Sequence, residues 1–216
     1  MREADVHAVA KRLSPAAVAD ALNEVPAPHL FRRLFHLISP IFLGYYVVPE
    51  QFPNGVTRES LLILFFGTAM AIEVARIALR IPIFGMRGYE AERLSAYAWG
   101  TIGLVIGFLF FDPVLVIPVF CGMAWIDPLC AWSAKANVYP WVPAIAYATV
   151  FAGWLVLLRP LHSLDFLEIA ALTAIALPVA LLAEYPNFRW IDDDFLMTIA
   201  PLLVLAPVLI AFSALP

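Results

Sequence analysis

The sequence predicts an all-α protein, a polytopic transmembrane bundle of about seven helices with its N-terminus in the cytoplasm. Hydrophobic residues make up 63% of its 216 residues and charged residues only 14%, whereas soluble domains contain about 45–50% and about 25% of these classes. The apolar residues also gather in stretches close to the roughly 20 residues that one membrane-spanning helix needs. With only 10 glycines and no strand-like alternation of apolar and polar residues, helices are expected rather than strands.

The same composition excludes several classes of protein. A water-soluble enzyme would carry many more charged residues, and a disordered chain would be far less hydrophobic. The formal net charge of -4 has the wrong sign for binding the phosphate backbone of a nucleic acid. What remains is an integral membrane protein, which we expect in the inner (plasma) membrane of the cell.

Residues 1–28 differ from the rest of the chain, because charged residues are mixed there with apolar residues at helical spacing. Ser14 followed by Pro15 is typical of a helix start. Acidic residues interrupt any apolar run, so the segment is not a secretory signal peptide. We therefore expect an amphipathic segment at the membrane surface over 1–28, ahead of a transmembrane helical domain over 29–216. A partly ordered tail is the alternative.

Seven apolar stretches follow this segment. Several contain proline, which predicts kinked or broken helices. Gly103 and Gly107 predict close packing of the third stretch against another helix. Cys121 and Cys130 lie about 13–14 Å apart along a helix, which is too far for a disulfide, so we expect ordinary core residues. The stretches are 34–49, 59–79, 95–111, 113–134, 136–158, 166–184 and 195–215.

Basic residues predict the orientation, because cytoplasmic loops of membrane proteins carry an excess of Lys and Arg. With seven spans and a cytoplasmic N-terminus, only Arg58 and Arg159 of the 13 basic residues lie on the far side. Polar groups near span ends also gather on the cytoplasmic side, where they suggest a site for a charged cytosolic compound. These groups are His36, Glu73, Arg76, Glu90, Glu92, Arg93, Asp127, Lys135, Glu184 and Asp192 to Asp194.

Asp127 interrupts the fourth stretch and is followed by Pro128. Proline removes a backbone donor and disfavours the helical conformation of the residue before it. We therefore expect a broken span, with a short half-helix that starts at Pro128 and is capped by Asp127. Such a helix N-terminus attracts anions, and the carboxylate beside it is a natural ligand for Mg²⁺. A capping Asp at a proline kink, without any ligand, is the alternative.

Two further clusters could bind a charged ligand. The sequence Ile-Asp-Asp-Asp-Phe over 191–195 opens the last stretch, and three consecutive carboxylates repel one another unless a cation or a helix N-terminus neutralises them. A metal or phosphate contact is one interpretation, and a well-capped helix start is the other. Glu73 and Arg76 form an i, i+3 pair. Arginines beside carboxylates also suit phosphate binding, with snorkelling at the membrane surface as the alternative.

The chain lacks a glycine-rich loop that could wrap a phosphate. After Gly122 the sequence contains only Gly153, and such loops need glycine because it lets several N–H groups converge. A nucleotide site would therefore depend on helix dipoles, arginines and a metal ion.

The order of the motifs resembles the dolichol kinase and phytol kinase family of membrane polyprenol kinases, which phosphorylate long-chain lipid alcohols with CTP or a related nucleotide. The likeness covers roughly residues 30–205. The motifs, in chain order, are RRLFHL, EVARIALR, YEAERLSAYAWGTIG, CGMAWIDPLCAWSA and LLAEYPNFRWIDDDF.

The resemblance implies a set of site residues, each matched to a family motif. The catalytic groups would be Asp127 and Glu184. The nucleotide and phosphate ligands would be Arg33 (or its neighbour Arg32), Arg76, Arg93 and Lys135. The Mg²⁺ ligands would be Asp127, Asp192 and Asp193, with His36 and Glu92 also at the site. The sequence departs from the family where Ile126 replaces a glycine, where Asp194 replaces an asparagine, and where a later Lys-Ser-x-x-Gly element is not visible.

The favoured hypothesis is thus a lipid-alcohol kinase of the polyprenol, phytol or dolichol type, with CTP as co-substrate, Mg²⁺ as cofactor and its site at the cytoplasmic face. A phosphatidate cytidylyltransferase-like enzyme is one alternative. Another is a non-catalytic lipid-binding relative that has lost the nucleotide cradle, and a transporter with an ion site at Asp127 is a third. The expected partners are the lipid alcohol, the nucleotide and membrane lipids, and a homo-oligomer stays open.

Overall fold

The computed structural model describes residues 26–81, 86, 90–184, 188 and 190–213, and over these residues the fold consists of helices without any strand. Nearly all of the amphipathic segment predicted over 1–28 lies outside the described residues. The helices are α3 (Pro26–Ile38), the 3₁₀ helix η1 (Ser39–Val47), α4 (Arg58–Leu79), α5 (Ala96–Phe110), α6 (Pro113–Lys135), α7 (Trp141–His162), α8 (Phe166–Glu184) and α9 (Asp193–Ser213).

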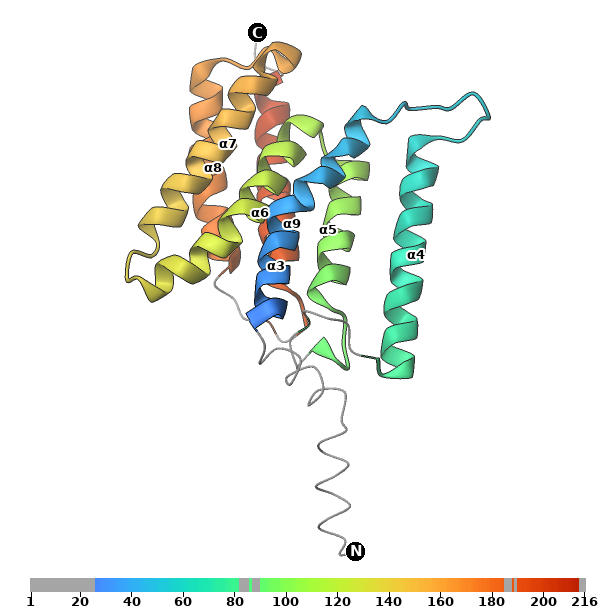
Figure 1. Ribbon diagram of the computed structural model, residues 1–216. Coiled ribbons are helices and arrows are strands. Elements are labelled where there is room, and N and C mark those ends of the chain that lie inside the picture. The colour runs from blue at the N-terminus through green and yellow to red at the C-terminus, as the bar shows by residue number, and fades with distance from the viewer. Residues whose placement is uncertain (1–25, 82–85, 87–89, 185–187, 189, 214–216) are drawn as a thin grey trace, which may run out of the picture.

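The helices run back and forth between two ends of one bundle (Figure 1). We call the end where α3, α5, α7 and α9 begin the lower end, as in Figure 1, and the opposite end the upper end. α6 and α9 lie in the middle, where α6 packs against α7 and α9, and α9 also packs against α5 and α8. α4 stands at one side of the bundle and packs mainly against α5.

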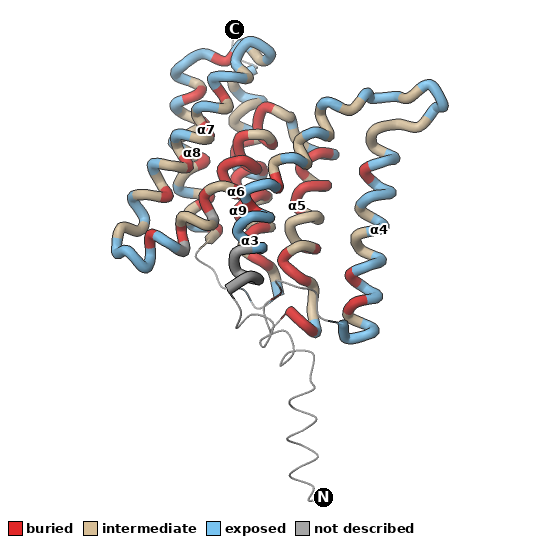
Figure 2. The backbone as a smooth tube through the Cα atoms, viewed as in Figure 1, coloured by how far each residue is buried: buried red, intermediate tan, exposed pale blue. Residues whose placement is uncertain are grey.

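Among the described residues, five helices are long and apolar enough to cross a membrane: α4, α6, α7, α8 and α9. Large parts of α4, α7 and α8 are exposed (Figure 2). The exposed residues include the apolar side chains Ile63, Leu157 and Leu182, as expected for contact with lipid. α5 has 15 residues, about 22 Å of helix against a hydrocarbon core of about 30 Å. The first predicted stretch is divided between α3 and η1. The all-helical class is confirmed, while seven spans and the cytoplasmic N-terminus stay predictions.

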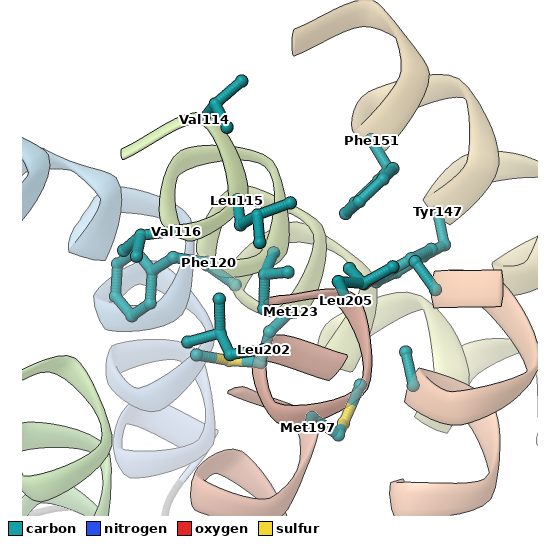
Figure 3. Close-up of a cluster of buried hydrophobic side chains, with 14 of the residues drawn as sticks. Val114, Leu115, Val116, Phe120, Met123, Tyr147, Phe151, Met197, Leu202 and Leu205 are labelled. Carbon is teal, nitrogen blue, oxygen red and sulfur yellow. The ribbon is translucent and has the colours of Figure 1, made fainter. Parts of the chain in front are cut away.

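The core of the bundle forms around α6. Its buried side chains, Leu115 and Phe120 among them, pack with Phe151 of α7 and with Leu202 and Leu205 of α9 (Figure 3). The predicted close packing at the two glycines of α5 is confirmed, because a Cβ at either position would lie only 3.4–3.5 Å from side chains of α9 or α6. The two cysteines are free and buried, as expected.

The prediction of a broken span at Asp127 and Pro128 is wrong, because α6 runs from Pro113 to Lys135 with Pro118 and Pro128 inside it. Proline removes one hydrogen bond, but a helix covered by its neighbours tolerates that loss, and α6 is covered by α7 and α9. The anion-attracting half-helix expected at Pro128 is therefore not formed. The backbone of Asp127 belongs to α6, and its side chain lies outside the described part of the structure.

Gly122 marks a close approach of α6 to α7, and we expect its replacement to destabilise the bundle. A Cβ at this position would lie 2.7 Å from Cε2 of Tyr147, a side chain that is only 1% exposed. Gly122→Ala should therefore lower the free energy of unfolding by about 1–3 kcal/mol through overpacking. Gly153→Ala is the matched control, since nothing lies within 4 Å of that position. Equal thermal unfolding midpoints for the two variants in detergent would contradict the prediction.

Candidate functional site

A cavity of about 430 Å³ lies between α3 with η1, α4, α5 and α6. This volume falls within the range of about 300–1,000 Å³ that is common for small-molecule sites. Most of the lining is apolar, as with Leu62, Leu104 and Phe120. Ile41 of η1 and Phe65 of α4 also line it and are exposed on the surface. The cavity is thus an apolar space that opens on the side of the bundle between η1 and α4.

Polar side chains from four segments gather at the lower end of this cavity: Arg32, His36, Glu90, Tyr97 and Asp194. Nη1 of Arg32 lies 3.7 Å from Oε1 of Glu90. Nε2 of His36 lies 3.7 Å from Oδ2 of Asp194. His36, Glu90 and Asp194 are all buried, where opposite charges in contact offset part of the cost of desolvation. The lower end of the cavity therefore holds two pairs of a basic and an acidic side chain, Arg32 with Glu90 and His36 with Asp194, beside an apolar space.

The local sequence explains how α3 presents its side of the site. Arg32 and His36 are four residues apart, so they lie on the same face of the helix. α3 ends at Ile38, because Pro40 has no N–H to donate to the carbonyl of His36. Oγ of Ser39 donates to that carbonyl instead, at 2.8 Å. The chain then continues as η1 along the wall of the cavity.

Arg76 of α4 uses all of its five N–H groups on acceptors within the protein. Nε and Nη2 donate to the carboxylate of Glu73 at 2.9 and 2.7 Å. Nη1 donates to the carbonyls of Glu90 and Ala91, both at 3.2 Å, and Nη2 also donates to the carbonyl of Arg93. The predicted i, i+3 pair is confirmed, and in this conformation Arg76 has no N–H left for a phosphate.

The same cluster positions one of the charged groups of the cavity. Oε1 of Glu73 also accepts a hydrogen bond from the backbone N–H of Ser95 at 2.6 Å, and Oγ of Ser95 caps α5 by accepting from the N–H of Ala98. Residues 90–95 are thereby held against the lower end of α4. Glu90, which belongs to this turn, is held beside Arg32.

The three consecutive aspartates open α9 as predicted, with Asp193 as its first residue. Carboxylate oxygens of Asp192, Asp193 and Asp194 lie within 4.8 Å of one another. The backbone N–H of Asp194 donates to Oδ1 of Asp192 at 3.2 Å. Hard carboxylate oxygens are the ligands that Mg²⁺ prefers, so the chemistry of this donor set fits a divalent cation.

Electrostatics at Asp192 favour a positive charge nearby. Burial, and next the charge of Asp193, raise the pKa of Asp192 to about 7, whereas the charge of Arg32 acts to lower it. Because this pKa is above that of an unfolded chain, the folded state holds an extra proton between about pH 4 and about pH 7. Ionisation of Asp192 therefore opposes folding as the pH rises from about 4 to 7. A bound cation would relieve that penalty.

Of the predicted nucleotide ligands, Arg32, the alternative to Arg33, lines the cavity, whereas the others lie around it. Arg33, Glu92 and Lys135 are exposed, and Arg93 is half-buried with its carbonyl bound to Arg76. The structure does bring the predicted His36 next to the predicted aspartates, through Asp194.

Glu184, a predicted catalytic group, ends α8 at the lower end of the bundle. Its Oε2 accepts a hydrogen bond from the hydroxyl of Tyr139 at 3.1 Å. It does not line the cavity, and its predicted catalytic role, like that of Asp127, stays a prediction.

Two cavity residues were missed as site residues. Tyr97 sits in an apolar stretch, where an aromatic residue is indistinguishable from the core. Glu90 was noted only as one carboxylate of a loop. For Arg32 a signal was available, because its i, i+4 spacing to His36 distinguishes it from Arg33.

Comparison of the chain with models of protein families, with curated proteins and with solved structures found no match in any of the three. Any functional conclusion therefore rests on the geometry of this chain and on the order of its own motifs.

Proposed function

We propose that the chain is a membrane lipid-alcohol kinase, which transfers a phosphoryl group from CTP or a related nucleotide to the hydroxyl of a long-chain alcohol. One observation carries the proposal: an apolar cavity that opens on the side of the bundle has His36 and Asp194 at its lower end. An amphipathic lipid matches both halves of such a site, because its tail is apolar and its head is polar. The order of motifs that resembles the polyprenol kinases supports the type of reaction.

In this proposal the lipid tail lies along the apolar wall formed by Leu62, Leu104 and Phe120. The lipid enters from the bilayer between η1 and α4, where exposed Ile41 and Phe65 line the opening. Its hydroxyl then faces the polar lower end. Burial of the tail supplies the binding energy, at about 25 cal/mol per Å² of apolar surface.

The proposed chemistry uses the His36 and Asp194 pair. Because Nε2 of His36 faces Asp194 at 3.7 Å, the other ring nitrogen, Nδ1, accepts the proton of the lipid hydroxyl while the oxygen attacks the terminal phosphorus of the nucleotide. A new O–P bond forms, and the bond from that phosphorus to the nucleoside diphosphate breaks, leaving its electron pair on the diphosphate. Asp194 orients the imidazole and stabilises its positive charge. We assign the base to His36 rather than to Glu184 because His36 lines the cavity.

The nucleotide would bind at the lower end of the bundle, with that end in the cytoplasm. Asp192 and Asp193, together with Asp127, would hold Mg²⁺, whose chemistry when bound is to neutralise the phosphate oxygens. Exposed Arg33 and Lys135 are the proposed phosphate contacts. Arg93 is proposed to join them, and Arg76 has a structural role.

The direct test is a transfer assay with the purified full chain in detergent. We expect label from γ-labelled CTP or ATP to appear on farnesol, phytol or a longer prenol, and only when Mg²⁺ is present. Label transferred from α-labelled CTP to phosphatidate would indicate the cytidylyltransferase instead. If millimolar nucleotide gives neither transfer nor a thermal shift, the kinase proposal is wrong.

A non-catalytic lipid-binding protein is the second candidate, and a specific observation favours it. α6 is unbroken at Pro128, so the helix N-terminus that was expected to help bind phosphates is not formed there. Prenol binding without any response to nucleotide would identify this second function.

A further inference from the structure

Tyr97 is a polar residue of the cavity to which the proposed mechanism gives no role. It lies in the first turn of α5 and lines the lower end of the cavity. Its ring packs edge-on against Phe35, with 5.0 Å between the centroids and 80° between the planes. Its hydroxyl oxygen is buried and has no hydrogen-bond partner among the described residues. A buried hydroxyl is costly to leave unpaired, which suggests that a ligand supplies the partner.

The other hydroxyls near the polar end are already used. Oγ of Ser39 donates to the carbonyl of His36 at 2.8 Å. Oγ1 of Thr101 donates to the carbonyl of Tyr97 itself at 2.7 Å. Both protons are therefore held by backbone carbonyls, that of Ser39 by the last turn of α3 and that of Thr101 by α5 itself. The side-chain O–H of Tyr97 is the hydroxyl donor at this end that the described residues leave available.

The cavity also has a definite length. One face of α5 lines it from Tyr97 to Phe108, a separation of about 16 Å at 1.5 Å per residue. At the upper end Phe108 stacks on Tyr45, with ring centroids 4.5 Å apart. The guanidinium of Arg58 lies over the ring of Tyr45, 4.6 Å from its centroid. A single extended chain of roughly a dozen carbons, the length of three isoprene units, spans this distance.

We propose that Tyr97 binds the hydroxyl of the ligand, so that the cavity selects a single-chain alcohol of about three isoprene units with its head at the lower end. This inference rests on the proposed function, because it concerns the same lipid site. The Tyr97 O–H donates to the alcohol oxygen, and the proton of the alcohol stays available to His36. The alcohol oxygen thus has a donor on one side and a base on the other. In this position the Tyr97 hydroxyl orients the alcohol oxygen for its attack on the nucleotide.

The test compares binding of farnesol with binding of farnesene, a hydrocarbon with the same tail, to the full chain in detergent without nucleotide. For the wild-type chain we expect farnesol to bind about 2- to 10-fold more tightly, the gain from one hydrogen bond. In Tyr97→Phe this preference should fall to what the alcohol's own hydrogen bond to His36 provides while farnesene affinity is unchanged, which also shows that the variant is folded. Tyr46→Phe is the matched control, because its hydroxyl is also buried without a partner in the described part of the chain. Tyr46 lies in η1 toward the upper end, so the preference for farnesol should remain in this variant.

An unchanged preference in Tyr97→Phe would overturn the role of Tyr97. The length is tested separately with geranylgeraniol, which has one more isoprene unit and should bind more weakly than farnesol to the wild-type chain. Equal affinity for the two alcohols would overturn the length limit. Binding of prenols without phosphoryl transfer would refute the kinase alone, whereas failure of every prenol to bind would refute both proposals.

Discussion

Replacing Arg76 by methionine should lower the free energy of unfolding by about 3–5 kcal/mol. The side chain is 2% exposed and that of Glu73 is 6% exposed, so the variant leaves a carboxylate buried without its cation. The carbonyls of Glu90, Ala91 and Arg93 also lose their donor. Removal of one partner from a buried ion pair is far more damaging than replacement of both. Chemical or thermal unfolding in detergent measures the effect.

Two controls separate this buried cluster from a general effect of charge. Arg80→Met removes an exposed arginine at the C-terminal cap of the same helix and should change stability by less than about 0.5 kcal/mol. The double variant Glu73→Gln with Arg76→Met should be less destabilised than the sum of the two single variants, because the unpaired charge is gone. If Arg76→Met unfolds at the same midpoint as Arg80→Met, the structural role of Arg76 is wrong.

Features whose cause is local were predictable from the sequence. Asp followed by Pro, as at Asp112, is typical of a helix start, and Oδ1 of Asp112 accepts a hydrogen bond from the N–H of Val114 at 2.9 Å at the start of α6. The i, i+3 spacing of Glu73 and Arg76 indicated their pair. In these cases the interacting groups are a few residues apart, so spacing alone decides the contact.

Features that depend on packing between distant segments were not predictable. Pro128 removes a hydrogen bond within α6 itself, and this effect is visible in the sequence. The packing of α7 and α9 on α6, which keeps the helix continuous, involves residues far away in the chain. The pairing of His36 with Asp194 joins α3 to α9. Tyr97 packs against Phe35 of α3 and lines a cavity whose walls come from several helices. No spacing rule within one helix contains this information, so the sequence predicted polar groups at the ends of several spans but not the cavity that brings some of them together.

His36→Gln should reduce the rate of phosphoryl transfer by about 10²- to 10⁴-fold, the usual contribution of a general base. Glutamine keeps a polar side chain opposite Asp194 and cannot accept the proton at a useful rate. Because the tail supplies most of the binding energy, the affinity for farnesol should change little. The measurement is the labelled-nucleotide assay, run beside the binding assay on the same preparation.

The chain contains a matched control for this variant. Nε2 of His162 also lies 3.7 Å from an aspartate oxygen, Oδ1 of Asp112, but at the upper end of the bundle. His162→Gln should therefore leave the transfer rate unchanged, and an equal loss in both histidine variants would refute the assignment. If His36 and Asp194 act as a unit, the double variant His36→Gln with Asp194→Asn should be no slower than His36→Gln alone. Additive losses would instead mean that Asp194 acts on the nucleotide side, as one member of the aspartate cluster.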